Sequence, residues 1–181
     1  MRKIIFIGGI HGVGKSTFCQ KVSRILDVQH FSASTLINME NRVSNDNISA
    51  VNIQRNQKLL LTALDKLPPE DVYLIDGHYC LINSRGIIHK IPLSVFENIN
   101  PKVIITLTDK CDRIAIRLKK KEDIILNEDF IPDFQKSEIS YSEEVAESLG
   151  ASYLCASIYE NEQEVITFIK NFLLDPSISE K

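Results

Sequence analysis

One stretch near the start of the chain, IIFIGGIHGVGKSTF, restricts the possible folds more than any other feature of the sequence. Its opening apolar run predicts a strand covered on both faces, as parallel strands usually are. Gly9, Gly14, Lys15 and Ser16 follow in the spacing G-x-x-x-x-G-K-[ST], the pattern of a phosphate-binding loop. Residues 15–26 are predicted to form a helix. A strand, a glycine-rich turn and a helix in this order predict an α/β domain with an anion-binding turn.

Each residue type in this turn has a physical role in binding phosphate. Glycines permit positive φ angles, so that successive N–H groups point inward and form a nest for anions. The helix that follows adds the positive end of its dipole and its free N–H groups. Lys15 is expected to bring a full charge to the β- and γ-phosphates of a nucleotide, and the Ser16 hydroxyl to bind Mg²⁺. The residues predicted to contact the nucleotide are Gly9, His11, Gly12, Val13, Gly14, Lys15, Ser16 and Thr17.

A second anchor for Mg²⁺ is expected at a carboxylate that ends a buried strand. Asp76 ends the apolar run VYLID at residues 72–76 and fits this role, either as a direct ligand or through a water molecule. The alternative is that Asp76 only caps a turn, because Asp-Gly is a common turn dipeptide. The phosphate-binding loop favours the metal role, so Ser16 and Asp76 are predicted to hold Mg²⁺.

Short apolar runs alternate with helical stretches along the chain. Strands are predicted at residues 4–8, 28–33, 72–76, 103–108 and 152–156. Helices are predicted at residues 15–26, 49–67, 109–121, 134–149 and 160–174. Asp109 is expected to cap its helix, and Gly86 to turn a small hairpin at residues 80–91. The alternation predicts an α/β fold with a mainly parallel five-stranded sheet, helices on both faces and a ligand site at the carboxyl ends of the strands.

The composition indicates one globular domain at residues 1–174, followed by a polar tail at 175–181. A length of 181 residues suits one domain, and a net charge of −3 argues against binding to a nucleic-acid backbone. The first apolar run is too short for a secretion signal or a membrane span. The cysteines form no C-x-x-C pair and are expected to be buried free thiols in a reducing cytoplasm: Cys19, Cys80, Cys111 and Cys155.

Basic residues gather at one helix end. Arg113 and Arg117 are four residues apart and therefore share a helix face, and lysines follow at 119–121. Arg117 is the candidate phosphate contact, while a solvated basic helix end that favours the helix dipole is the alternative. The polar segment at residues 32–66 is the candidate acceptor-binding segment. Its arginines, Arg42 and Arg55, are either contacts of the acceptor or ordinary helix surface.

These features resemble the P-loop nucleoside and nucleotide kinases, and the chain is most similar to the archaeal-type adenylate kinases and their short relatives. The resemblance covers residues 1–173 and rests on GGIHGVGKST, LIDGHYCLINSRGIIHKIP, VFENINPKVIITLTDKCDRIAIRL and EISYSEEVAESLGASYLCAS. Asp76-Gly77-His78 matches the D-x-H triplet that ends the third strand in that family. Arg117 stands where a lid arginine is expected.

The resemblance implies a three-layer fold, ATP with Mg²⁺ as donor, a nucleoside monophosphate as acceptor, and a small lid over residues 118–132. Catalysis is thereby assigned to Lys15, Asp76 and Arg117. His78 would orient the acceptor or a water molecule, or else be a structural histidine beside the site. The side chain of His11 is expected to face outward, and an orientation toward the acceptor is the alternative.

Three classes of function follow from these expectations. The first is an ATP-dependent kinase of a small molecule, adenylate-kinase-like. The second is a P-loop ATPase or nucleotide switch that acts through a protein partner. It is suggested because that family's lid usually carries several arginines, whereas no arginine follows Arg117 here and the lysines are point charges. The third, a polynucleotide end kinase, is disfavoured by the acidic net charge. The acceptor, the choice between ATP and GTP, and the oligomeric state are left open.

Overall fold

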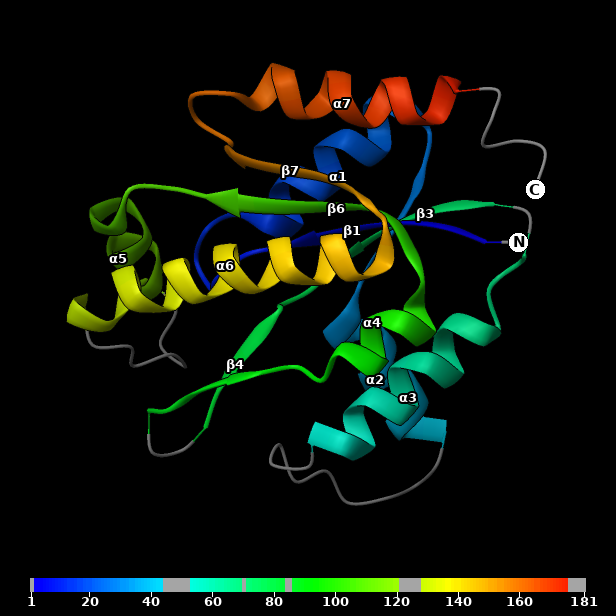
Figure 1. Ribbon diagram of the computed structural model, residues 1–181, viewed down its shortest axis with the longest axis horizontal. Coiled ribbons are helices and arrows are strands. Elements are labelled where there is room, and N and C mark those ends of the chain that lie inside the picture. The colour runs from blue at the N-terminus through cyan, green and yellow to red at the C-terminus, as the bar shows by residue number, and fades with distance from the viewer. Residues whose placement is uncertain (1, 44–52, 70, 84–85, 121–127, 176–181) are drawn as a thin grey trace.

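The computed structural model describes residues 2–43, 53–69, 71–83, 86–120 and 128–175 of the chain. These residues form three layers around a central sheet (Figure 1). Helices α1 (Lys15–Leu26) and α7 (Glu162–Leu174) lie on one side of the sheet, and α6 (Ile131–Leu149) lies on the other. The predicted arrangement of helices on both faces is therefore confirmed.

The central sheet has five parallel strands in the order β2-β3-β1-β6-β7. Because β1 is the middle strand and helices cover both faces, its side chains are buried on either side, which explains its unbroken apolar run. The predicted five-stranded parallel sheet is confirmed. The bounds of its strands are β1 Lys3–Gly8, β2 Gln29–Ser32, β3 Val72–Asp76, β6 Pro101–Thr108 and β7 Ser152–Ser157.

The remaining described elements lie outside the central sheet. Helix α3 packs against both α2 and α4, and the antiparallel hairpin β4–β5 contacts α6. Among the described residues, no helix has both the length and the apolar character needed to cross a membrane. The bounds of these elements are α2 Ala33–Val43, α3 Ile53–Asp65, β4 Cys80–Ile82, β5 Ile88–Lys90, α4 Leu93–Ile99, α5 Cys111–Lys119 and the 3-10 helix η1 Glu128–Phe130.

The structure differs from the sequence-based expectations in three local respects. Helix α2 was not predicted, because residues 33–43 are mostly polar and bury only a narrow side around Leu36. Asp109 is not the N-cap of α5; Lys110 takes that position, and the Asp109 carboxylate faces arginines instead. Helix α6 begins at Ile131, ahead of the expected start, since a proline fits the first turn of a helix.

The cysteines confirm part of the prediction made for them. All four are free thiols, and Cys19 and Cys80 are buried as expected. Cys111 is half-buried and Cys155 is exposed, because β7 is an edge strand of the sheet. The expectation of four buried thiols was therefore wrong for these two.

Strand pairing places the end of β3 beside the glycine-rich turn. Ile7 near the end of β1 pairs with Asp76, and Ser32 at the end of β2 pairs with Asp76 from the other side. Parallel strands end at the same edge of a sheet, and ligands of such sheets bind there. The register thus brings Asp76 next to the turn that leaves β1.

The ring of Tyr79 fills the space above the last residue of β1. Tyr79 is fully buried, its hydroxyl donates to the carbonyl oxygen of Ile105 at 3.0 Å, and its ring centroid lies 5.3 Å from that of Phe6. A Cβ atom at Gly8 would lie 2.0 Å from Cε2 of this ring. Only glycine fits at the end of β1 while Tyr79 keeps its place.

We predict that Gly8→Ala destabilises the protein, because the new methyl group would overlap the buried Tyr79 ring. Overpacking of this kind costs about 1–3 kcal/mol in the free energy of unfolding, measurable by urea denaturation. In a Tyr79→Leu background the same substitution should cost less, since the ring is gone. An equal cost in both backgrounds would show that the clash is not the cause.

Candidate active site

Three glycines shape the turn between β1 and α1. Gly9, Gly12 and Gly14 have φ angles of 139°, 80° and 109°, all in the region that favours glycine. A Cβ atom at Gly9 would also lie 2.5 Å from the carbonyl oxygen of Leu107 on β6. Gly14 is the N-cap of α1, whose first residue is Lys15. Positive φ angles between ordinary residues turn successive N–H groups toward one centre, which is the backbone requirement of an anion nest.

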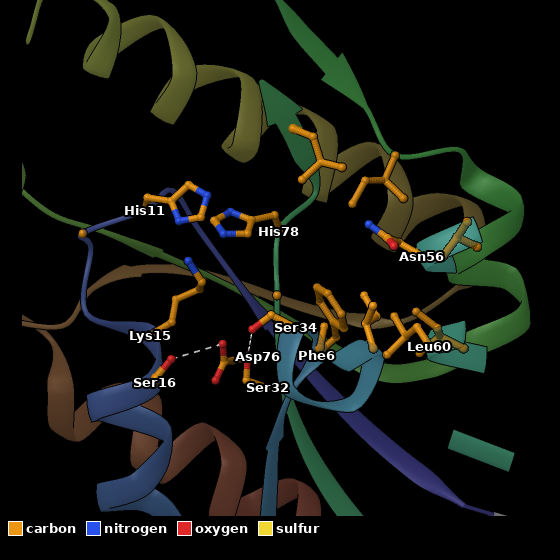
Figure 2. A pocket seen from close by; sticks show the side chains of 18 of the residues that line it. Phe6, His11, Lys15, Ser16, Ser32, Ser34, Asn56, Leu60, Asp76 and His78 are labelled. Carbon is orange, nitrogen blue, oxygen red and sulfur yellow. Dashed lines mark hydrogen bonds between the residues drawn. The ribbon is translucent and has the colours of Figure 1, made fainter. Parts of the chain in front are cut away.

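Lys15 folds back into this turn. Its side chain is mostly buried, with the residue 8% exposed, and Nζ donates to the carbonyl oxygens of Gly9 at 2.6 Å and Ile10 at 3.0 Å. Figure 2 shows its ammonium group beneath the rings of His11 and His78. An ammonium charge held in a turn with a helix N-terminus favours an anion at this place.

Asp76 is contacted from two other elements. The residue is 3% exposed, and Ser16 Oγ on α1 lies 3.3 Å from Oδ1 (Figure 2). His30 Nε2 on β2 lies 2.6 Å from Oδ2. The Ser16 and Asp76 oxygens are hard donors at a separation that fits neighbouring ligands of one Mg²⁺ ion. These residues therefore suit the ion that the sequence assigns to them.

His30 was not found from the sequence. It lies in a short strand whose pairing with β3 decides which side chains reach Asp76. Its bond to Oδ2 leaves the other carboxylate oxygen facing Ser16, so His30 orients the carboxylate. No sequence motif signals that contact.

His78 lies over the phosphate-binding turn. Its ring centroid is 4.1 Å from that of His11, an exposed residue whose side chain lies beside His78 above Lys15 and does not face away from the site (Figure 2). Burial, followed by the nearby charge of Lys15, lowers the pKa of His78 well below its usual value. His78 is therefore a neutral imidazole at physiological pH.

Glu138 on α6 lies behind His78 and was also missed from the sequence. It is fully buried, and its carboxylate accepts hydrogen bonds from the backbone N–H groups of Tyr79 at 3.1 Å and Cys80 at 3.1 Å. His78 Nδ1 lies 3.4 Å from Oε1 without hydrogen-bond geometry. Burial raises the pKa of Glu138 to about 7, against the lowering effect of Lys15 and of the two backbone donors. Glu138 thus fixes the chain segment that carries His78.

Arg117 contacts the turn from its outer side. Its guanidinium donates to the carbonyl oxygens of Gly12 at 2.7 Å and Val13 at 3.2 Å, and also to the carboxylate of Asp109. Arg113 contacts Asp109 as well, and both guanidinium groups lie over the ring of Tyr159. The two arginines share a helix face, as predicted. Phosphate contact by Arg117 stays a prediction, and residues 121–127 of the predicted lid lie outside the described residues.

A cavity of about 700 Å³ extends from this turn toward α2, α3 and α4. Lys15, Ser16, Asp76 and His78 line one end (Figure 2). The predicted acceptor-binding segment supplies part of the remaining lining, to which it contributes Ser32, Ala33, Ser34, Ile37, Asn56, Gln57 and Leu60. Arg55 is not among the residues that line the cavity. Residues 44–52 and the side chain of Arg42 lie outside the part of the chain that the structure describes.

A parallel sheet that brings a glycine-rich turn of the G-x-x-x-x-G-K-[ST] pattern and a carboxylate at the end of the neighbouring strand to one edge is the arrangement of the P-loop nucleotide-binding proteins. The fold and the site assign the chain to that class. Within it, the chain belongs to the AAA domain family, whose model matches residues 8–129.

Individual proteins similar to this chain include several kinases. An adenylate kinase of Methanococcus aeolicus is 23% identical over 133 residues, which cover 66% of this chain and 69% of that protein. A shikimate kinase from Acinetobacter baumannii, solved in complex with shikimate, has a TM-score of 0.62 at 15% identity and 97% coverage of both chains. A gluconokinase from Sinorhizobium meliloti 1021 has a TM-score of 0.55 at 10% identity, covering 99% of this chain and 97% of that chain. The chain thus has the fold of small P-loop kinases.

We predict that Glu138→Gln changes how stability depends on pH. The folded-state pKa of about 7 exceeds the usual 4.5, so the folded protein binds the proton of Glu138 more tightly than the unfolded chain does. The contribution of Glu138 to the free energy of unfolding therefore falls as the pH rises from about 4.5 through 7. The wild type should therefore lose up to about 3 kcal/mol relative to the glutamine variant between pH 4.5 and pH 8. Urea denaturation across this range measures the difference. Glu147→Gln, at an exposed position of the same helix, should show the same dependence of stability on pH as the wild type. If the Glu138→Gln variant also showed the wild-type dependence, the prediction would be contradicted.

We also predict that Arg117→Lys weakens nucleotide binding. A lysine cannot bond to the Gly12 and Val13 carbonyl oxygens and to the Asp109 carboxylate at once, so the turn loses hydrogen bonds that hold its conformation. The dissociation constant of ATP should rise about tenfold in calorimetry, the effect of losing one charged hydrogen bond. Arg24→Lys, at an exposed position of α1, is the matched control. Unchanged affinity in Arg117→Lys would exclude this bracing role.

Proposed function

We propose that this protein is an ATP- and Mg²⁺-dependent kinase that transfers the γ-phosphate to a small molecule. The observation that carries this proposal is the cavity, which continues from Lys15 and Asp76 to a second, largely apolar end at Ile37 and Leu60. Nucleotide hydrolysis alone needs only the first end. A phosphotransferase needs a second pocket that holds the acceptor near the γ-phosphate and excludes water.

The residues of the turn would divide the work of phosphoryl transfer, which depends on positioning and on neutralising charge. Backbone N–H groups of residues 9–17 and the Lys15 ammonium would hold the phosphates. Ser16 and Asp76 would hold Mg²⁺, which when bound offsets the charge of the phosphate oxygens. Arg117 would brace the turn and complete the site from the side of a lid at residues 118–132.

The first candidate for the acceptor is a nucleoside monophosphate. The sequence resemblance supports it, and so does the likeness to an adenylate kinase of Methanococcus aeolicus. In this proposal, residues 1–174 form one kinase domain, with the acceptor held by the segment at 32–66. The four free thiols support a reducing compartment, so we place the protein in the cytoplasm.

We predict that Lys15→Ala and Asp76→Asn each lower the rate of ADP formation at least about a hundredfold, since each removes a charge that stabilises the transferring phosphate or its ion. A coupled assay with ATP, Mg²⁺ and a panel of nucleosides, nucleoside monophosphates, shikimate and gluconate measures this rate. Lys21→Ala, at an exposed lysine of the same helix, should keep wild-type activity. Lys15-dependent hydrolysis that no acceptor stimulates would instead favour an ATPase or nucleotide switch. Undiminished turnover in Lys15→Ala would end the proposal.

A further inference from the structure

The charges along the cavity are unevenly distributed. Among the lining residues that the structure describes, the lysines and arginines are Lys15, Arg117 and Lys120, and all three lie on or beside the phosphate-binding turn or at the end of α5. Figure 2 shows Lys15 with His11 and His78 on one side, and Asp76 with Ser32 and Ser34 between them and the far end. Beyond the end formed by Lys15, Ser16 and Asp76, the middle of the cavity therefore carries the hydroxyl groups of Ser32 and Ser34.

The far end of the cavity is built from neutral side chains of five elements. Phe6 on β1 and Leu60 on α3 face it in Figure 2, and Ile37 on α2 continues the same wall. The hairpin supplies Leu81, and α4 supplies Val95, Phe96 and Ile99. Apolar walls of this kind bind the faces of a ring or a hydrocarbon, which gain by leaving water.

Two amide side chains interrupt these apolar walls. Asn56 and Gln57 lie in the first turns of α3, and the Asn56 amide is directed toward the cavity in Figure 2. Nε2 of Gln57 is buried and has no hydrogen-bond partner within the described part of the chain. A buried donor without a partner is costly, so a ligand that offers a carbonyl or ring-nitrogen acceptor would stabilise this arrangement.

We infer that the acceptor is an uncharged nucleoside, whose heterocycle lies between the apolar walls and whose hydroxyl group points to the phosphate-binding turn. The inference rests on the proposed kinase function and replaces the nucleoside monophosphate, its first candidate acceptor, with the uncharged nucleoside. Amides match the mixed donor and acceptor edge of a heterocyclic base, while the apolar walls match its faces. The serines beside Asp76 match a sugar hydroxyl.

The charge distribution disfavours a monophosphate in the same place. Its doubly charged phosphate would lie beside the uncharged Ser32–Ser34 pair, whereas the described lysines and arginines that line the cavity are at its other end. A charged group in a poorly hydrated site is strongly unfavourable unless a cation compensates it. Lys15 already serves the donor's phosphates in the proposed mechanism, whereas a hydroxyl group brings no charge.

The transfer balances for a neutral acceptor. The hydroxyl oxygen of the nucleoside forms a bond to the γ-phosphorus of ATP, and the bond between that phosphorus and the β,γ-bridging oxygen breaks. The products are the nucleoside monophosphate and ADP, and the hydroxyl proton is released to solvent. The ring of His78 lies above the Lys15 side chain at this end of the cavity (Figure 2).

Matched pairs of nucleosides and their 5′-monophosphates test the inference with the full-length protein, ATP and Mg²⁺. We expect kcat/KM for at least one nucleoside to exceed that of its monophosphate about tenfold or more. Preference for the monophosphate, or transfer only to polyols or to shikimate, would overturn the inference and leave the kinase function standing. Failure of every acceptor to stimulate Lys15-dependent turnover would overturn both.

A variant at the far end of the cavity tests the contact with the base. Gln57→Leu should raise KM for the preferred nucleoside about tenfold with little change in kcat. The base would lose one hydrogen bond that it makes equally well in the ground state and in the transition state. An unchanged KM in this variant would count against the inference.

A variant in the middle of the cavity tests the charge argument. Ser34→Arg adds a cation at an exposed position that the fold tolerates, and should shift the kcat/KM ratio at least about tenfold toward the monophosphate. Thr35→Arg is the matched control, because Thr35 is the next residue of α2, is also exposed and does not line the cavity. An unchanged ratio in Ser34→Arg, or an equal shift in Thr35→Arg, would contradict the inference.

Discussion

The parallel pairing of β1 with β3 is the contact on which the site depends. It sets Ile7 opposite Asp76, so a carboxylate ends beside the residue where β1 enters the glycine turn. A shift of the register by one residue would turn the Asp76 side chain to the other face of the sheet. The buried ring of Tyr79 holds this edge from above, since it packs on Gly8 and bonds to Ile105 of the next strand. The geometry of the turn is thus a property of the core.

Lys15, Asp76 and Glu138 are ionisable side chains that are buried around that edge, and each is held differently. Lys15 donates to carbonyl oxygens of its own turn, Asp76 is contacted by a hydroxyl and an imidazole, and Glu138 accepts from backbone N–H groups. Burying a charge is costly unless such partners replace water. The pKa of Glu138 is raised to about 7 because its burial outweighs two backbone donors and the distant charge of Lys15. A bound phosphate would change this balance most at Lys15, which lies at the mouth of the turn.

The sequence predicts those parts of the fold and site that depend on local pattern. The phosphate-binding turn, the five parallel strands and the shared face of Arg113 and Arg117 follow from spacing alone. His30 and Glu138 do not, because strand register and the packing of α6 bring them to Asp76 and His78. Helix α2 also escapes prediction, since α3 packs against it and compensates for its polar sequence. Tertiary contact, which a single sequence does not display, decides these positions.

The two ends of the cavity are formed by different parts of the chain. A sequence motif therefore indicates the nucleotide phosphates at one end more readily than the ligand at the other end. Backbone geometry shapes the phosphate end, so the glycines that permit it leave a recognisable pattern. Side chains of α2, α3 and α4 shape the other end, where many apolar combinations give a wall of similar shape. Related folds can therefore keep one phosphate site and hold unlike acceptors. Whether charged side chains line the far end of such a cavity is then a better guide to its ligand than overall similarity, because a charged ligand needs an opposite charge whereas an apolar wall accepts many ring shapes.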